Sequence, residues 1–260
     1  MEINNIYNED CLDVMEDIPD KSIDLTVTSP PYDNLREYNG FSFDFQSVIQ
    51  ELYRVTKLGG VVVWVVGDAT IKGSETGTSF KQALYFKEVG FNLHDTMIWN
   101  KRKCASIGSL TRYESTFDYM FVFSKGKPKT VNIIKDKPNK HAGETQHGSA
   151  RGRDGIVRKT SNYGKKEIAQ FGRRPNVWDI VPYFSKKERM HPAPFPEQLA
   201  HDHILSWSSE GDIVFDPFMG SGTTAKMAIA NNRKYIGAEI SQEYINIANK
   251  RIEERQYSLV

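Results

Sequence analysis

The chain has 260 residues, enough for one large α/β domain or for a domain that carries a sizeable insertion. Its 39% hydrophobic and 26% charged residues are ordinary for a soluble globular protein, and no apolar run approaches the ~18 residues of a transmembrane helix. The N-terminus lacks the basic start and apolar stretch of a signal peptide, and two cysteines are too few for a disulfide framework. We therefore expect a cytoplasmic protein that has no transmembrane helix and is not stabilised by disulfide bonds.

The charge is unevenly distributed along the chain. Residues 125–175 contain 14 Lys or Arg and four acidic residues, a net charge of +10, whereas the rest of the chain carries −9. This excess is typical of a segment that contacts a polyanion, although a solvated basic loop would have the same composition. The side chains expected at a nucleic-acid backbone are Arg151, Arg153, Arg158, Lys159, Lys165, Lys166, Arg173 and Arg174.

Strands and helices are expected to alternate. Short apolar and β-branched runs indicate strands, and segments with apolar residues on one helical face indicate helices. Gly59-Gly60 is expected to end the second helix, and residues 34–43 are interpreted as a polar loop. In chain order we expect a strand over 5–7, a helix over 11–18, a strand over 22–27, a helix over 45–56, a strand over 61–66, a helix over 79–89, strands over 93–99 and 117–123, a helix over 196–207, a strand over 213–215, a helix over 223–230, a strand over 235–239 and a helix over 243–255.

This alternation predicts the α/β class, with a mostly parallel, doubly wound, Rossmann-like sheet flanked by helices. Residues 125–180 have little apolar periodicity and are expected to form an irregular insertion between two halves, 1–124 and 181–260. Ligands of open α/β sheets bind beyond the carboxyl ends of the strands. Residues that follow the strands are therefore the first candidates for a functional site.

A glycine-rich turn, DPFMGSGTT at residues 216–224, follows one expected strand. It lacks the Gly-Lys-Ser/Thr of a phosphate loop, and Ala225 replaces the third glycine of a dinucleotide fingerprint. Asp216 at the strand end favours a cationic group, and Glu239 at the next strand end is suited to ribose hydroxyls. Both acids could instead cap helices. The pair favours S-adenosylmethionine, a nucleoside cofactor that carries an ammonium group.

A proline turn, Ser29-Pro30-Pro31-Tyr32, follows another expected strand. The exocyclic amino group of a base is a poor nucleophile because its lone pair is delocalised into the ring. The Ser29 hydroxyl and the Pro30 carbonyl could accept its hydrogens and free that lone pair, while prolines add no competing N–H. Tyr32 offers a face for an extruded base, and such stacking contributes ~1–3 kcal/mol. A rigid loop with a packed tyrosine would contain the same residues.

Together these motifs resemble the amino-methylating DNA methyltransferases, which modify cytosine N4 or adenine N6. TSPPY at residues 28–32 is similar to their catalytic motif, and DPFMGSGTT is similar to their cofactor motif. The catalytic motif comes first and the basic segment lies between the two, which resembles the circularly permuted β class. Residues 8–12 and 191–197 resemble segments at the adenine side and the methionine end of the cofactor.

The resemblance implies direct transfer of a methyl group from S-adenosylmethionine to a flipped base, with S-adenosylhomocysteine as product. It implies no metal and no covalent enzyme–base intermediate, so Cys11 and Cys104 are interpreted as structural. The catalytic residues would be Ser29, Pro30, Pro31 and Tyr32. The cofactor-binding residues would be Asp10, Cys11, Ser29, Phe195, Pro196, Asp216, Pro217, Phe218, Gly220, Ser221, Gly222, Thr223, Glu239 and Ile240.

The resemblance also implies the partners. Double-stranded DNA would be the substrate, and residues 125–180 would be its target-recognition region. A monomer or homodimer is expected, with a cognate restriction endonuclease as a further partner and no membrane contact.

Ser29 favours cytosine N4 as the target, because family members with Asp at this position mostly methylate adenine N6; adenine N6 stays open. A protein-glutamine methyltransferase fits less well, since its motif starts with Asn and follows the cofactor motif. An RNA base methyltransferase and a non-enzymatic nucleic-acid-binding protein also stay open. The latter would not need Ser29, Asp216 and Glu239 together at strand ends.

Overall fold

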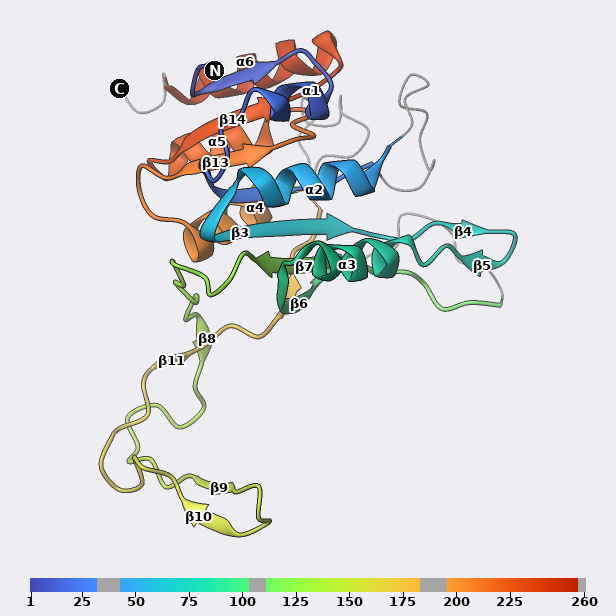
Figure 1. Ribbon diagram of the computed structural model, residues 1–260. Helices are drawn as coiled ribbons and strands as arrows, with labels where there is room; N and C mark the ends of the chain where they lie inside the picture. The colour runs from blue at the N-terminus through green and yellow to red at the C-terminus, as the bar shows by residue number, and fades with distance from the viewer. Residues whose placement is uncertain (32–42, 103–110, 183–195, 257–260) are drawn as a thin grey trace. The chain divides into compact units, whose positions relative to one another are not determined.

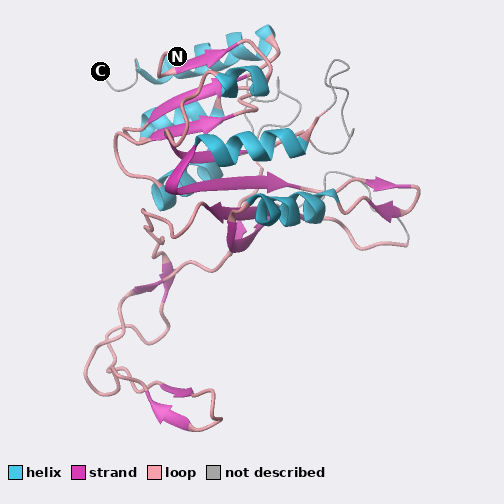
Figure 2. Ribbon diagram, viewed as in Figure 1, coloured by secondary structure: helices cyan, strands magenta, loops and turns pink. Residues whose placement is uncertain are grey.

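The computed structural model describes residues 1–31, 43–102, 111–182 and 196–256. The chain forms two compact units (Figures 1 and 2). The main unit comprises residues 1–132 and 176–260, and the inserted unit comprises residues 133–175. None of the described helices is long and apolar enough to cross a bilayer.

A central sheet organises the main unit. Its described strands run in the order β1-β14-β13-β2-β3-β7-β6-β12. All neighbouring pairs are parallel except those of β7, which is antiparallel to both β3 and β6. The prediction of a mostly parallel sheet is thereby confirmed. The strands are β1 (Asn5–Tyr7), β2 (Ile23–Thr28), β3 (Thr56–Val66), β6 (Asn92–Asn100), β7 (Phe117–Ser124), β12 (Val177–Asp179), β13 (Ile213–Asp216) and β14 (Lys234–Ala238).

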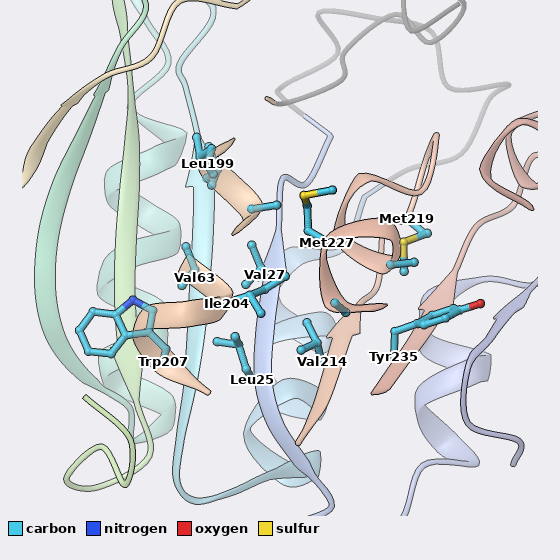
Figure 3. Close-up of a cluster of buried hydrophobic side chains, with 14 of the residues drawn as sticks. Leu25, Val27, Val63, Leu199, Ile204, Trp207, Val214, Met219, Met227 and Tyr235 are labelled. Carbon is cyan, nitrogen blue, oxygen red and sulfur yellow. The ribbon is translucent and has the colours of Figure 1, made fainter. Parts of the chain in front are cut away.

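Helices cover both faces of this sheet, as a doubly wound fold requires (Figure 1). They are α1 (Cys11–Glu16), α2 (Phe45–Val55), α3 (Thr78–Val89), α4 (Glu197–Trp207), α5 (Thr223–Ala230) and α6 (Gln242–Gln256). Apolar residues of α1, α2 and α3 pack in one buried cluster, and those of α4, α5 and α6 pack in the other. Figure 3 shows part of the second cluster, to which α4 contributes Leu199 and Ile204 and β3 contributes Val63.

β3 shows why the core has two layers. Its apolar run is buried throughout. Successive side chains of a strand point to opposite faces, so Val63 joins the cluster of α4–α6 and Trp64 joins the cluster of α1–α3. A continuous apolar run is the expected sequence of a strand covered on both sides.

The predicted helix over 45–56 is confirmed to within one residue, but the prediction that Gly59-Gly60 ends it is wrong. α2 ends at Val55, and β3 already begins at Thr56, opposite Ile23 of β2. The pairing then shifts and resumes at Val61, so the two glycines lie in an irregular stretch inside the strand. Gly59 has a φ of +84°, and a Cβ on Gly60 would lie 2.7 Å from the Thr56 Cγ2, which accounts for glycines in this stretch.

The inserted unit is built from short antiparallel pairs. β8 (Lys137–Pro138) pairs with β11 (Phe171–Gly172), and β9 (Ser149–Arg151) pairs with β10 (Val157–Lys159). It comprises residues 133–175 of the expected insertion at 125–180; residues 125–132 and β12, which pairs with β6, belong to the main unit. In the main unit, a further small hairpin joins β4 (Thr70–Ile71) to β5 (Ser74–Glu75).

Candidate active site

Residues that follow four neighbouring strands meet at one edge of the central sheet. β13 is parallel to both β2 and β14, and β1 is parallel to β14. The carboxyl ends of parallel strands share one edge, so the segments that follow them lie together there. These segments begin with Ser29 after β2, with the glycine turn at the end of β13, with Glu239 after β14 and with Asn8 after β1.

The buried Asp216 carboxylate joins the end of β2 to the glycine turn. Its Oδ1 accepts hydrogen bonds from the Thr28 hydroxyl at 2.6 Å and from the Phe218 N–H at 3.0 Å. Its Oδ2 accepts one from the Thr224 hydroxyl of α5 at 2.7 Å. Because Thr28 immediately precedes Ser29, a single side chain connects the two motifs found in the sequence.

Burial raises the pKa of Asp216 to about 6, although the hydrogen bonds from Thr28, Thr224 and the Phe218 N–H act in the opposite direction. Asp216 is 1% exposed. The Thr224 hydroxyl also lies 3.2 Å from the Val27 carbonyl oxygen. It can donate to that carbonyl when a protonated Asp216 becomes the donor, so the same network suits both protonation states.

The glycine turn is held in a conformation that side chains rarely adopt. Gly220 and Gly222 have φ angles of +52° and +79°. A Cβ placed on Gly222 would lie 2.7 Å from the Cβ of Ala248, so α6 packs directly on the turn. The turn leads into α5, which leaves backbone N–H groups at its first residues available to a ligand.

Glu239 fastens the other side of the same turn. Its Oε2 accepts a hydrogen bond from the Gly220 N–H at 2.8 Å, and its Oε1 accepts one from the Ser241 N–H at 2.9 Å. Desolvation raises the pKa of Glu239, against the effect of these backbone hydrogen bonds. One buried and one half-buried carboxyl group therefore lie at neighbouring strand ends, an environment that favours a cationic ligand.

The segment after β1 supports this edge of the sheet. The Asn8 Nδ2 donates to the carbonyl oxygens of Glu239 at 3.0 Å and Ile240 at 2.9 Å. Asp10 caps α1 by accepting a hydrogen bond from the Leu12 N–H at 2.8 Å. Cys11 is buried, and its desolvation, together with the charge of Asp10, raises the pKa of its thiol. A protonated buried thiol is no nucleophile.

The remaining predicted site residues are placed as follows. Ser29 and Pro31 are half-buried and Pro30 is buried, directly after β2. Pro196 is buried at the start of α4. Pro217, Ser221 and Thr223 are buried in the turn. Tyr32 and Phe195 lie outside the described residues, as do Cys104 and almost all of the expected polar loop.

The basic residues of the inserted unit differ in their surroundings. Arg151, Arg153, Lys165, Lys166 and Arg173 are exposed. Three exposed side chains have partners within the unit. Arg151 donates to the Gly155 carbonyl oxygen at 3.0 Å, Arg158 pairs with Asp154 at 2.7 Å, and the Lys159 ammonium lies 4.4 Å from the centre of the Tyr163 ring.

Arg174 differs from all of these. It is half-buried and pairs with Asp136 across the inserted unit. Its charge is thus compensated within the fold, and its predicted contact with DNA stays a prediction.

Sequence reasoning did not single out Thr28 and Thr224. The signal was present for Thr28, since Asp24, Thr26 and Thr28 alternate with apolar residues in a strand that is buried along its whole length. Most buried hydroxyls have a hydrogen-bond partner, and for Thr28 that partner is Asp216 on the adjacent strand β13. The signal for Thr224 was weaker, because its partner becomes evident only when α5 is placed beside β2.

Known proteins are similar to this chain in sequence and in fold. A family model described as DNA methylase, the N6/N4 group, matches residues 23–250. The orphan methyltransferase M.BamHII of Bacillus amyloliquefaciens is 61% identical over 245 residues, which cover 91% of this chain and 91% of that protein.

Two solved structures share the fold. The PvuII DNA methyltransferase, specific for cytosine N4, superposes with a TM-score of 0.68 at 23% identity and covers 95% of this chain and 85% of its own. The complex of M1.HpyAVI with SAM has a TM-score of 0.63 at 22% identity and covers 95% of this chain and 98% of its own. These likenesses confirm the Rossmann-like fold.

Proposed function

This chain belongs to the N6/N4 DNA methylase family, and from that premise we propose that it transfers a methyl group from S-adenosylmethionine to the N4 amino group of cytosine in double-stranded DNA. The 2.6 Å hydrogen bond from Thr28 to Asp216 is the main support. It keeps the Ser29-Pro30 turn beside the glycine turn, as direct transfer between a cofactor and a base requires.

The residues at the sheet edge fit S-adenosylmethionine. The glycine turn allows close approach of the cofactor, and the Glu239 carboxylate lies where ribose hydroxyls are bound in related folds. Asp216 would act by its charge on the cationic cofactor, because it is fully buried behind the turn, whereas the half-buried Glu239 could accept further hydrogen bonds. Asp10, Cys11 and Ile240 would line the adenine side, and Phe195 and Pro196 the methionine end.

The proposed catalytic step needs little from the protein beyond orientation. The cofactor would supply a methyl group bound to a positively charged sulfonium sulfur. When the amino nitrogen takes this methyl group, the sulfur–methyl bond breaks and the rest of the cofactor becomes a neutral thioether. The Ser29 hydroxyl and the Pro30 carbonyl accept hydrogens of the amino group and so favour a nitrogen with an available lone pair. Tyr32 stacks on the flipped base, and the surplus proton passes from nitrogen to solvent.

Ser29 supports cytosine as the base, because a neutral hydroxyl can face its ring N3 without charge repulsion. Adenine N6 is the second candidate, since the family includes both activities. We propose the inserted unit as the target-recognition region. The similar protein M.BamHII is named an orphan methyltransferase; a cognate restriction endonuclease for this chain, and its state as a monomer or homodimer, remain predictions.

One assay tests the base and the chemistry together. The purified protein is incubated with S-adenosylmethionine and duplex DNA, and the DNA is digested to nucleosides and separated. We expect N4-methylcytosine. N6-methyladenine would refute the choice of base, and the absence of saturable S-adenosylmethionine binding would refute the proposed function.

Ser29→Ala tests the catalytic turn. The loss of one hydrogen bond to the amino group is expected to lower kcat by about tenfold or more, and the affinity for S-adenosylmethionine should fall by less. Single-turnover kinetics and calorimetry measure the two quantities separately. Equal losses in both would indicate that Ser29 supports the cofactor rather than the base.

A further inference from the structure

Arg251 of α6 holds the glycine turn through several contacts. Its Nη1 donates to the Ser221 carbonyl oxygen at 2.6 Å and to the Ser221 Oγ at 2.8 Å, and it lies 3.3 Å from the Thr223 Oγ1. Arg251 is 9% exposed. A planar guanidinium offers donors in fixed directions, so one side chain can fix both the backbone and the hydroxyls of the turn.

Glu197 connects the same arginine to the start of α4. The Arg251 Nη2 donates to the Glu197 Oε1 at 2.9 Å, and the Lys226 ammonium of α5 contacts the same oxygen. Glu197 is the first residue of α4 and directly follows Pro196. One carboxylate therefore ties three helices together around the turn.

The backbone packing of α6 provides separate support. Ala248 precedes Arg251 by three residues and so lies on the same face of the helix. The Cβ of Ala248 is in the place where a side chain on Gly222 would collide. This face of α6 is therefore packed against the turn. The hydrogen bonds of Arg251 are made to a backbone that is already in contact with the helix.

We propose that Arg251 is a positioning residue for the methyl donor. It holds residues 220–223 in the conformation that receives the donor, and through Glu197 it keeps Pro196 at the edge of the same site. Arg251 acts through the turn and does not touch the reacting atoms. The inference rests on the proposed binding of S-adenosylmethionine at this turn.

The test compares S-adenosylmethionine affinity in Arg251→Met and Glu197→Gln with that of the wild-type protein. Arg251→Met removes several charge-assisted hydrogen bonds that hold the turn. The affinity for S-adenosylmethionine should therefore fall by about tenfold or more. Glu197→Gln should weaken it less, because the contacts of Arg251 with Ser221 remain. The KM for S-adenosylmethionine should rise in both variants, while the KM for DNA and the kcat at saturating cofactor stay near the wild-type values.

Arg54→Met is the matched control. Arg54 on α2 also donates to a carboxylate, Glu51, at 2.7 Å and to backbone carbonyls, those of Met15 and Ile18. Its loss removes a similar network that does not contact the glycine turn. We expect a lower Tm with unchanged affinity for S-adenosylmethionine.

The outcomes separate this inference from the proposed function. If the wild-type protein binds S-adenosylmethionine and Arg251→Met only lowers the Tm, as Arg54→Met does, Arg251 is structural and the inference is wrong. If Arg251→Met does not fold, Glu197→Gln decides, and unchanged affinity in that variant refutes the inference. A wild-type protein that binds no S-adenosylmethionine would refute the proposed function, and this inference with it.

Discussion

At the Asp216 carboxyl group, burial and hydrogen bonding act in opposite directions on the pKa, and burial has the larger effect. The pKa in the folded chain is about 6, compared with an ordinary value of 3.8. The folded state therefore binds this proton more tightly than the unfolded state. The resulting contribution to stability is complete below the ordinary pKa and is lost as the pH rises through the folded value.

Asp216→Asn tests this linkage, because an amide keeps the shape of the side chain and removes its titration. As the pH rises from about 4 to about 7, the free energy of unfolding of the wild-type protein should fall relative to that of the variant. Urea denaturation at several pH values measures the difference. A difference that stays constant over this range would contradict the raised pKa.

Thr26 and Thr28, two residues apart on β2, give a contrasting pair. Among the described residues, the buried Thr26 hydroxyl has no hydrogen-bond partner, whereas the Thr28 hydroxyl donates to Asp216. Thr26→Val should therefore leave stability unchanged or raise it by about 1 kcal/mol, and Thr28→Val should lower it by about 1–3 kcal/mol. Equilibrium unfolding in urea compares the two, and equal destabilisation would argue against this difference in hydrogen bonding.

Single site residues could be predicted from the sequence only where they belong to a motif. Ser29, Asp216 and Glu239 could be found from their positions at predicted strand ends. Arg251 could not, because its contact with Ser221, 30 residues earlier, depends on how α6 docks. Periodicity predicts that α6 exists but not which of its polar side chains faces the turn.

Among the elements, the glycine turn depends on both its backbone angles and its contact with α6. Gly222 and Gly211 have nearly equal φ angles, +79° and +81°. A Cβ on Gly222 would collide with Ala248, whereas a Cβ on Gly211 would meet nothing within 4 Å. The two positions therefore separate backbone strain from steric conflict.

Gly222→Ala is expected to lower stability more than Gly211→Ala. Both substitutions incur about 1–2 kcal/mol for the left-handed backbone, and overpacking against α6 adds about 1–3 kcal/mol at Gly222 alone. Thermal unfolding measures the difference. The affinity for S-adenosylmethionine should fall only in Gly222→Ala, and similar effects of both variants would show that the contact with Ala248 is easily relieved.

The order and type of the larger elements were predictable from their apolar patterns, whereas β12, β4 and β5 were missed because each has only two or three residues. The boundary between α2 and β3 was not predictable, since Gly59-Gly60 has the composition of a helix end while its role depends on pairing with β2. The short pairs of the inserted unit were also missed. Their strands have two or three residues, too few to show any periodicity.

For the whole molecule, the dominant property is the separation of charge along the chain. The segment 125–175 carries +10 and the remainder carries −9. Exposed arginines and lysines can displace the counterions of DNA, whereas Arg174 is already neutralised by Asp136. The exposed basic residues of the inserted unit are therefore the better candidates for contact with phosphates.

Neutralising Arg151 and Arg153 together by Gln tests this assignment. Each phosphate contact contributes about 0.9 to the slope of log affinity against log salt concentration, so the double variant should flatten the slope by up to about 1.8. Neutralising Lys81 and Lys87, exposed lysines of α3, makes the same change of charge in the main unit. Titrations of DNA binding at several salt concentrations should show flattening only in the first variant; the same flattening in both would indicate a nonspecific effect of net charge.

The pairing of β1 with β14 has a consequence for the synthesis of the protein. The Asn4 side chain accepts a hydrogen bond from the Tyr235 N–H, 231 residues later, and β1 pairs in the sheet with β14. At the usual rate of translation, β14 is synthesised on the order of tens of seconds after β1. β13 likewise follows β2, with which it pairs. The sheet edge proposed to hold the cofactor can form only after β13 and β14 have been synthesised, and until then β1 lacks the strand with which it pairs.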